Sequence, residues 1–66
     1  MKKFIVRYSE KQSDWIEIAS FNDLGDAEKE FNNQILEDQK ENNQKNKTQI
    51  IDSSQKVIKE FTGKEY

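Results

Sequence analysis

This 66-residue chain contains neither cysteine nor histidine, so no thiol or imidazole is present for catalysis or metal binding. Cys₂His₂ zinc sites, Ser-His-Asp triads and Cys-His dyads therefore cannot form within one chain. No histidine is present to activate a serine as a nucleophile. The two glycines, Gly25 and Gly63, do not make a phosphate-binding loop. We expect a protein that is not an enzyme and that uses no cofactor.

A group of carboxylates, formed by Asp23, Asp26, Glu28 and Glu30, has the oxygen ligands that a hard cation prefers. Its spacing does not match a calcium-binding loop, and a pair for acid–base catalysis would need burial to separate the two pKa values. Asp23 is better explained as the N-cap of a helix, with Asp26 placed to complete a capping box. We therefore predict no metal site.

A set of aromatic and basic residues, Lys3, Arg7, Tyr8 and Trp15, resembles the side chains with which a sheet stacks nucleic-acid bases. That use needs the aromatic residues on one face. Alternation along the strands places Tyr8 and Trp15 on opposite faces, and the isoelectric point is about 5.1. Nucleic acid is therefore the less favoured partner.

Five segments would position these residues. Residues 3–9 and 14–21 alternate with a period of two, which predicts a hairpin of two strands across a polar loop. Leu24, Ala27, Phe31 and Ile35 form one apolar stripe of a helix that begins after Asp23 and ends near Asn42. Residues 48–52 and 55–61 predict two further strands joined by an Asp-Ser turn. A polar loop at about 40–47 and a flexible tail at about 62–66 complete a single domain of residues 1–66.

The order of these segments predicts an α+β fold, ββαββ, in which one helix packs on one face of a four-stranded antiparallel sheet. The strand order is left open. The helix-facing side is predicted to hold Phe4, Val6, Tyr8, Ile16, Ile18, Val57 and Phe61.

The sheet face away from the helix is more apolar than a face exposed to solvent requires. The predicted interaction face consists of Ile5, Arg7, Trp15, Glu17, Ile51 and Ile58. The pattern does not decide whether Ile50 or Ile51 faces the core. Two interpretations stay open: scattered apolar residues covered by the stems of Arg and Lys side chains, or an interface.

Charge is unevenly distributed along the chain, with a net −5 over residues 22–43 and mildly positive ends. Asp23, Asp26, Glu30, Glu37 and Glu41 would line the outer face of the helix. This acidic helix face could mimic a nucleic-acid backbone, although a solvated face is the commoner explanation.

The amino-terminal residues contain no apolar run long enough for a signal peptide, and no stretch reaches the length of a membrane span. The absence of cysteine favours a reducing compartment, so we expect a cytoplasmic protein with no membrane partner.

The run from Trp15 through Phe21, Asp23 and Ala27 to Phe31, followed by Ile50-Ile51-Asp52 and Val57-Ile58, resembles small uncharacterised ββαββ proteins of bacteria and their phages. That family pattern has a glycine in the last turn, where this chain has Ser53-Ser54-Gln55. The resemblance implies the fold and no catalytic residue.

Three functions remain as predictions. The favoured one is a non-enzymatic protein-interaction module, in concrete form a phage or mobile-element protein that inhibits a host defence protein. The alternatives are a nucleic-acid binder that uses the open sheet face and a self-associating structural protein, such as a homodimer.

Overall fold

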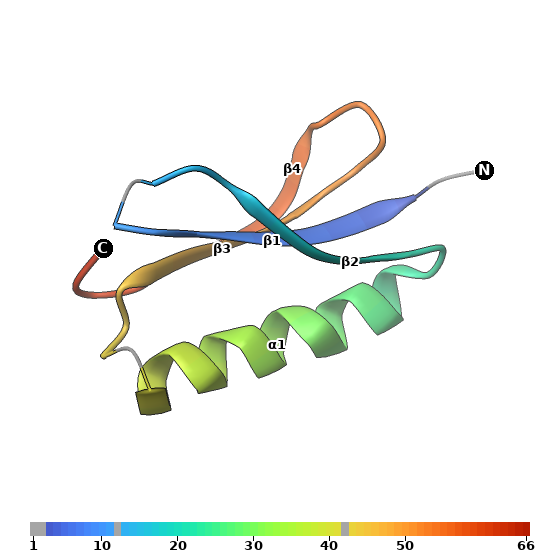
Figure 1. Ribbon diagram of the computed structural model, residues 1–66. Coiled ribbons are helices and arrows are strands. Elements are labelled where there is room, and N and C mark those ends of the chain that lie inside the picture. Colours follow the sequence, from blue (N-terminus) through green and yellow to red (C-terminus); the bar gives the residue numbers. More distant parts are fainter. Residues whose placement is uncertain (1–2, 12, 42) are drawn as a thin grey trace.

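The computed structural model describes residues 3–11, 13–41 and 43–66, which form one sheet and one helix (Figure 1). The elements are β1 (Phe4–Glu10), β2 (Ile16–Phe21), α1 (Leu24–Glu41), β3 (Asn46–Ile51) and β4 (Val57–Thr62). The predicted α+β fold, ββαββ, is confirmed. Met1, Lys2, the loop residue Gln12 and the predicted helix end Asn42 lie outside the described residues.

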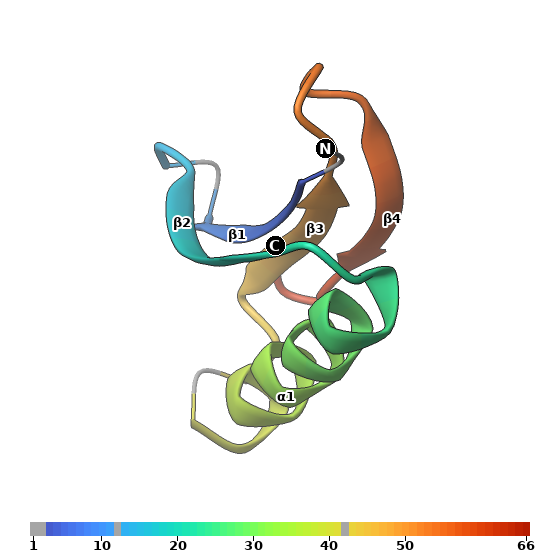
Figure 2. The ribbon, with the colours of Figure 1, turned by 90° about the vertical axis from the view of Figure 1, so that its right-hand side faces the viewer.

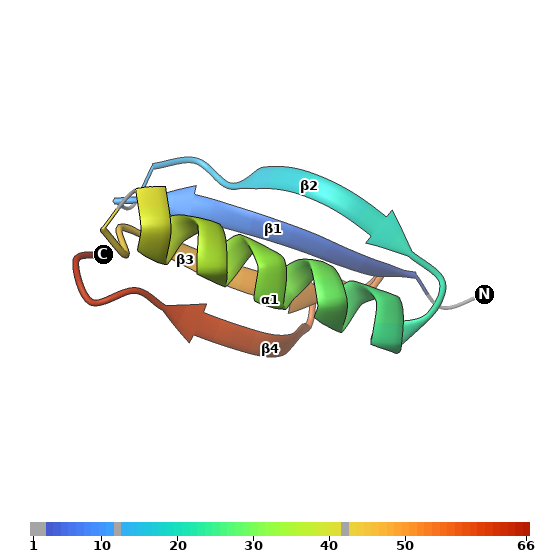
Figure 3. The ribbon, with the colours of Figure 1, turned by 90° about the horizontal axis from the view of Figure 1, so that it is seen from below.

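The strands form a single antiparallel sheet in the order β2-β1-β3-β4, so β2 and β4 are the edges. The sheet is curved: β2 and β4 rise on either side of β1 and β3, on the side away from the helix (Figure 2). Viewed from the helix side, α1 runs across β1 and β3, with β2 and β4 to either side (Figure 3). We call the uncovered, concave side of the sheet the open face.

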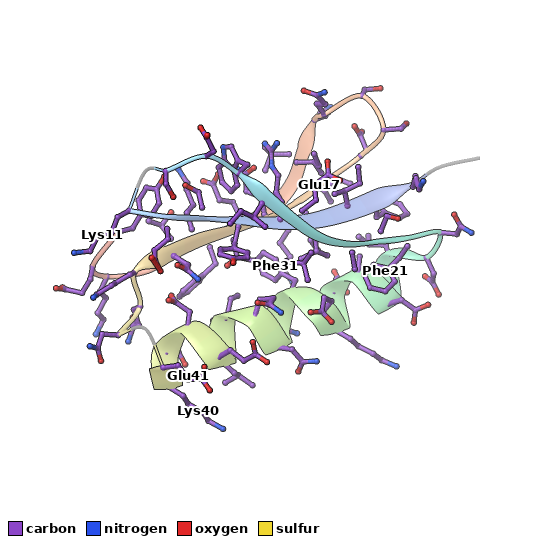
Figure 4. The ribbon with its side chains drawn as sticks, in the orientation of Figure 1. Lys11, Glu17, Phe21, Phe31, Lys40 and Glu41 are labelled. Carbon is purple, nitrogen blue, oxygen red and sulfur yellow. The ribbon has the colours of Figure 1, made fainter. Side chains whose placement is uncertain are left out.

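The core lies between α1 and the sheet face that is turned toward it, as the labelled Phe21 and Phe31 show (Figure 4). Its fully enclosed members are Val6, Ala27, Phe31 and Ile50. Partly buried apolar residues surround them, namely Phe4, Ile18, Phe21, Leu24, Ile35 and Phe61. The predicted helix stripe is thus part of the core. Ile50 is the isoleucine that faces the helix, because it pairs with the core residue Val6 across β1 and β3.

Two register shifts change which side chains reach this core. In β2, Ala19 pairs with Val6 and Glu17 pairs with Arg7, which leaves Ile18 as an extra residue. In β4, Lys59 pairs with Ile50 and Val57 pairs with Ile51, which leaves Ile58 as the extra residue.

The shift in β4 makes the predicted position of Val57 wrong, because this side chain lies beside Ile51 and stands outside the core. Ile16, also predicted to pack under the helix, pairs with Tyr8 but is 49% exposed. Both residues lie on edge strands, where the helix covers less of the sheet.

Local contacts explain where α1 begins. The Asp23 carboxylate accepts a hydrogen bond from the Gly25 N–H at 3.0 Å, as an N-cap does. Asp26 makes no side-chain hydrogen bond back to Asp23 within the described part of the chain, so the capping box is not formed. Leu36 is 51% exposed, as expected on the side of the helix opposite Ala27.

The connection from α1 to β3 is tied to the helix by a buried carboxylate. Asp38 is only 3% exposed and accepts hydrogen bonds from the backbone N–H groups of Lys45 and Asn46 at 3.0–3.2 Å. The predicted loop over residues 40–47 is therefore shorter, because α1 extends to Glu41 and β3 begins at Asn46.

The carboxyl-terminal residues pack against the same connection. Thr62 belongs to β4, the Gly63 N–H donates to the Asn46 carbonyl at 2.9 Å, and the Glu65 N–H donates to the Gln44 carbonyl at 2.9 Å. Of the segment predicted as a flexible tail, Thr62 thus belongs to β4, and backbone hydrogen bonds join Gly63 and Glu65 to the chain around the start of β3.

Candidate functional site

A row of polar side chains crosses the open face from edge to edge. Register places Glu17 on β2 opposite Arg7 on β1, Arg7 opposite Gln49 on β3, and Gln49 opposite Glu60 on β4. Residues that pair across antiparallel strands point to the same face. We call these four residues, Glu17, Arg7, Gln49 and Glu60, the polar row.

Hydrogen bonds fix the geometry of the polar row. Arg7 donates from both Nε and Nη2 to Oε1 of Gln49, at 2.9 and 2.8 Å. Gln49 in turn donates from Nε2 to a carboxylate oxygen of Glu60, which also lies 3.7 Å from Nζ of Lys47. Gln49 is 5% exposed, so its amide is held between two strands. The described contacts include no ion pair between Glu17 and Arg7.

Trp15 stands beside this row, one residue before β2. The Arg7 guanidinium lies 4.4 Å from the centre of the Trp15 ring, which is cation–π distance. Trp15 remains 36% exposed, so Arg7 stacks on the ring without enclosing it. Arg7 and Trp15, two of the predicted interaction residues, are therefore in direct contact on the open face.

The end of the open face near the β3–β4 turn is apolar, and neighbouring strands bury part of its apolar surface. Ile51 lies between Ile5 on β1 and Val57 on β4 in register. It is only 2% exposed, which corrects its expected role as an accessible interaction residue. Ile5 is half-buried, while Val57 and Ile58 are 44% and 41% exposed. The accessible apolar surface at this end therefore comes mainly from β4.

A cavity of about 490 Å³ lies at this end of the sheet, between Phe4 and the β3–β4 turn, with Val57 and Ile58 on its wall. Among the residues that the structure describes, its ionisable lining groups are Asp52 and Lys56. The Asp52 carboxylate already accepts the backbone N–H groups of Ser54 and Lys56 at 2.9 and 3.0 Å. These bonds hold the turn in place.

The residues of the predicted acidic helix face are largely exposed. Asp23, Asp26, Glu37 and Glu41 are exposed, and half-buried Glu30 accepts a hydrogen bond from Gln34 at 2.8 Å. Within the described residues, no group of acidic side chains is arranged to hold a metal ion. No helix in that part of the chain is both long and apolar enough to cross a membrane.

The sequence pattern did not identify Gln49 and Glu60 as part of the site. Each belongs to a strand whose alternation was visible, but their meeting with Arg7 depends on β1 pairing with β3. That pairing joins residues 42 positions apart. The one local signal was Gln49 itself, an amide directly before two isoleucines in a buried strand.

Comparison with known proteins gives no relative from which a role could be transferred. No protein family model, no curated protein and no solved structure matches the chain. The resemblance to bacterial and phage ββαββ proteins therefore stays a prediction based on the residues alone.

Proposed function

We propose that this chain is a non-enzymatic interaction domain that binds another protein through the open face. The observation that carries the proposal is the Arg7–Trp15 pair, a stacked and partly exposed aromatic–guanidinium contact on a sheet face that none of the described elements covers. Trp and Arg are the residue types most enriched among interface positions that dominate binding energy.

The polar row supports this function because it orders Arg7 before a partner arrives. Two of its N–H donors are used by Gln49, while a guanidinium has further donors that can meet a carboxylate or carbonyl of a partner. Holding a long side chain in one geometry reduces the entropy lost on binding, about 0.5–1.5 kcal/mol for such a residue.

In its concrete form, the proposed protein is a phage or mobile-element product that binds and inhibits a host defence protein in the bacterial cytoplasm. This form rests on the sequence resemblance and on the absence of cysteine.

Nucleic-acid binding is a weaker candidate for the same face. Tyr8 pairs with Ile16 and Thr48 on the helix side, so it does not join Trp15 on the open face. Glu17 and Glu60 also place carboxylates among Arg7 and Lys47, whereas a nucleic-acid site concentrates positive charge.

The test is affinity capture from bacterial lysate with the full chain as bait, with and without nuclease. Trp15→Ala should lose the captured protein, because removing a central aromatic contact costs 2 kcal/mol or more, about thirtyfold in affinity. Leu36→Ala is the matched control, since Leu36 is the exposed apolar residue on the far side of the helix.

Three results would overturn the proposal. Capture could be equal for Trp15→Ala and the original chain, or it could disappear with nuclease. Alternatively, light scattering across concentration could show that the chain associates only with itself.

A further inference from the structure

β4 is an edge strand, and within the described part of the chain no strand pairs with its outer side. Asn46 and Gly63 share a backbone hydrogen bond, and the register then alternates through Thr48–Phe61 and Ile50–Lys59. In an antiparallel ladder, the residues between such pairs turn their backbone groups away from the neighbouring strand. The N–H and C=O groups of Glu60 and Thr62 therefore point outward.

The usual protection of an edge strand is weak here. A lysine can block an edge, but Nζ of Lys59 lies 3.8 Å from Glu28 and 5.5 Å from the centre of the Phe31 ring, so it is turned toward the helix. Val57 and Ile58 leave apolar surface beside the edge. Only the extra residue Ile58 interrupts the strand, and it does so at one end.

We propose that this edge docks an extended segment of another protein, which adds to the sheet as a fifth strand antiparallel to β4 and carries a basic residue opposite Glu60. The proposal rests on the proposed function, because it names how the partner binds. Main-chain hydrogen bonds would supply affinity, and alternate side chains would supply selectivity.

Charge explains why the added strand should belong to a different protein. Two copies of the chain could instead pair their β4 strands around a two-fold axis. Residues opposite each other in such a pair lie on the same face of the sheet, whereas Lys59 lies on the helix side and Glu60 on the open face. Lys59 therefore cannot lie opposite Glu60 of the second copy. The two registers with the greatest overlap oppose Lys59 to Lys59 or Glu60 to Glu60, and like charges directly opposite are destabilising. A lysine or arginine on a foreign strand removes that penalty on the open face, where Glu60 has 39% of its side chain exposed.

The inference can be tested on the full chain with a strand tethered after Tyr66 by a glycine–serine linker. The tether supplies an effective concentration of about 1 mM for a weak strand. The probe strand alternates threonine and valine, with one lysine placed opposite Glu60. A chain that carries a glycine–serine extension of equal length is the reference.

Hydrogen exchange at the amides of Glu60 and Thr62 is the measurement. Both amides should exchange more slowly than in the reference chain. Glutamate in place of the probe lysine should weaken the protection by about two- to fivefold, which corresponds to an opposite-charge pair across two strands. Glu60→Lys should restore protection by the glutamate strand. Equal exchange with both extensions, or equal protection by both strands, would overturn the proposal.

Thr62→Pro separates this inference from the proposed function. It removes an outward N–H and leaves the pairing with β3 intact, which an edge strand tolerates. A captured partner should be lost with Thr62→Pro while circular dichroism shows an unchanged fold. If capture depends on Trp15 but not on Thr62, the open face is the binding surface and the edge is not.

Discussion

Replacing Asp38 with alanine should destabilise the domain more than any other exchange of an acidic residue on α1. The change removes the acceptor for the N–H groups of Lys45 and Asn46, and the Asn46 bonds are buried. A buried donor left without a partner costs about 1–3 kcal/mol, and a half-buried donor such as that of Lys45 costs less because water reaches it. Together these losses amount to about 2–3 kcal/mol.

A loss of this size is large for a chain of 66 residues. Domains gain roughly 0.05–0.15 kcal/mol of stability per residue, so the whole fold is worth about 3–10 kcal/mol. For a domain of this size, 1 kcal/mol shifts the melting temperature by about 4–8 °C. Asp38→Ala should therefore lower the midpoint of a circular dichroism melt by about 10–20 °C.

Two control variants make the result specific. Glu37→Ala removes the neighbouring exposed carboxylate and should change stability by less than about 0.5 kcal/mol, as surface substitutions do. Asp38→Asn keeps one carbonyl acceptor and should recover part of the loss. A melting point for Asp38→Ala within about 3 °C of the original chain would refute the reasoning, because it would show that water replaces the carboxylate without cost.

Three further predictions concern the turns and the carboxyl-terminal segment. Gly63→Ala places a Cβ in steric overlap with the Gln44 carbonyl oxygen, so it should destabilise the fold by about 1–3 kcal/mol in urea unfolding; an unchanged midpoint would show that residues 63–66 do not pack as described. Gln55 has a φ of 64°, so Gln55→Gly should raise stability by about 0.5–1 kcal/mol in the same assay, and a decrease would contradict this. Asp52→Ala removes the acceptor of two exposed turn amides and should cost about 1 kcal/mol, whereas Asp52→Asn should cost less.

Most of the fold was accessible to sequence reasoning because its signals are local. A strand is recognised from a few adjacent residues, as in the alternation of Phe4, Val6 and Tyr8. A helix is recognised from a few turns, as in the apolar stripe from Leu24 to Ile35. The Asp23 cap likewise acts within its own first turn. These patterns were sufficient to predict the number, type and order of the elements.

The face assignments failed where one extra residue enters a strand. Alternation assumes an uninterrupted period of two. One inserted residue breaks this period, so the side chains before it and after it no longer keep the faces that alternation assigns to them. Val57 was misplaced for this reason. Neither Ile18 nor Ile58 carries a signal in the sequence that distinguishes it from an ordinary strand residue.

The sequence by itself determined which chemical groups this protein has: no thiol, no imidazole and one tryptophan. It also determined a helix with one apolar stripe and acidic residues on the rest of its surface. The tertiary structure decided which of these groups meet. The strand order β2-β1-β3-β4 brings Glu17, Arg7, Gln49 and Glu60 into one row and stacks Arg7 on Trp15. It also buries Asp38 against the backbone of a later segment and leaves β4 as an open edge. These outcomes depend on pairing between distant segments, which local patterns do not contain.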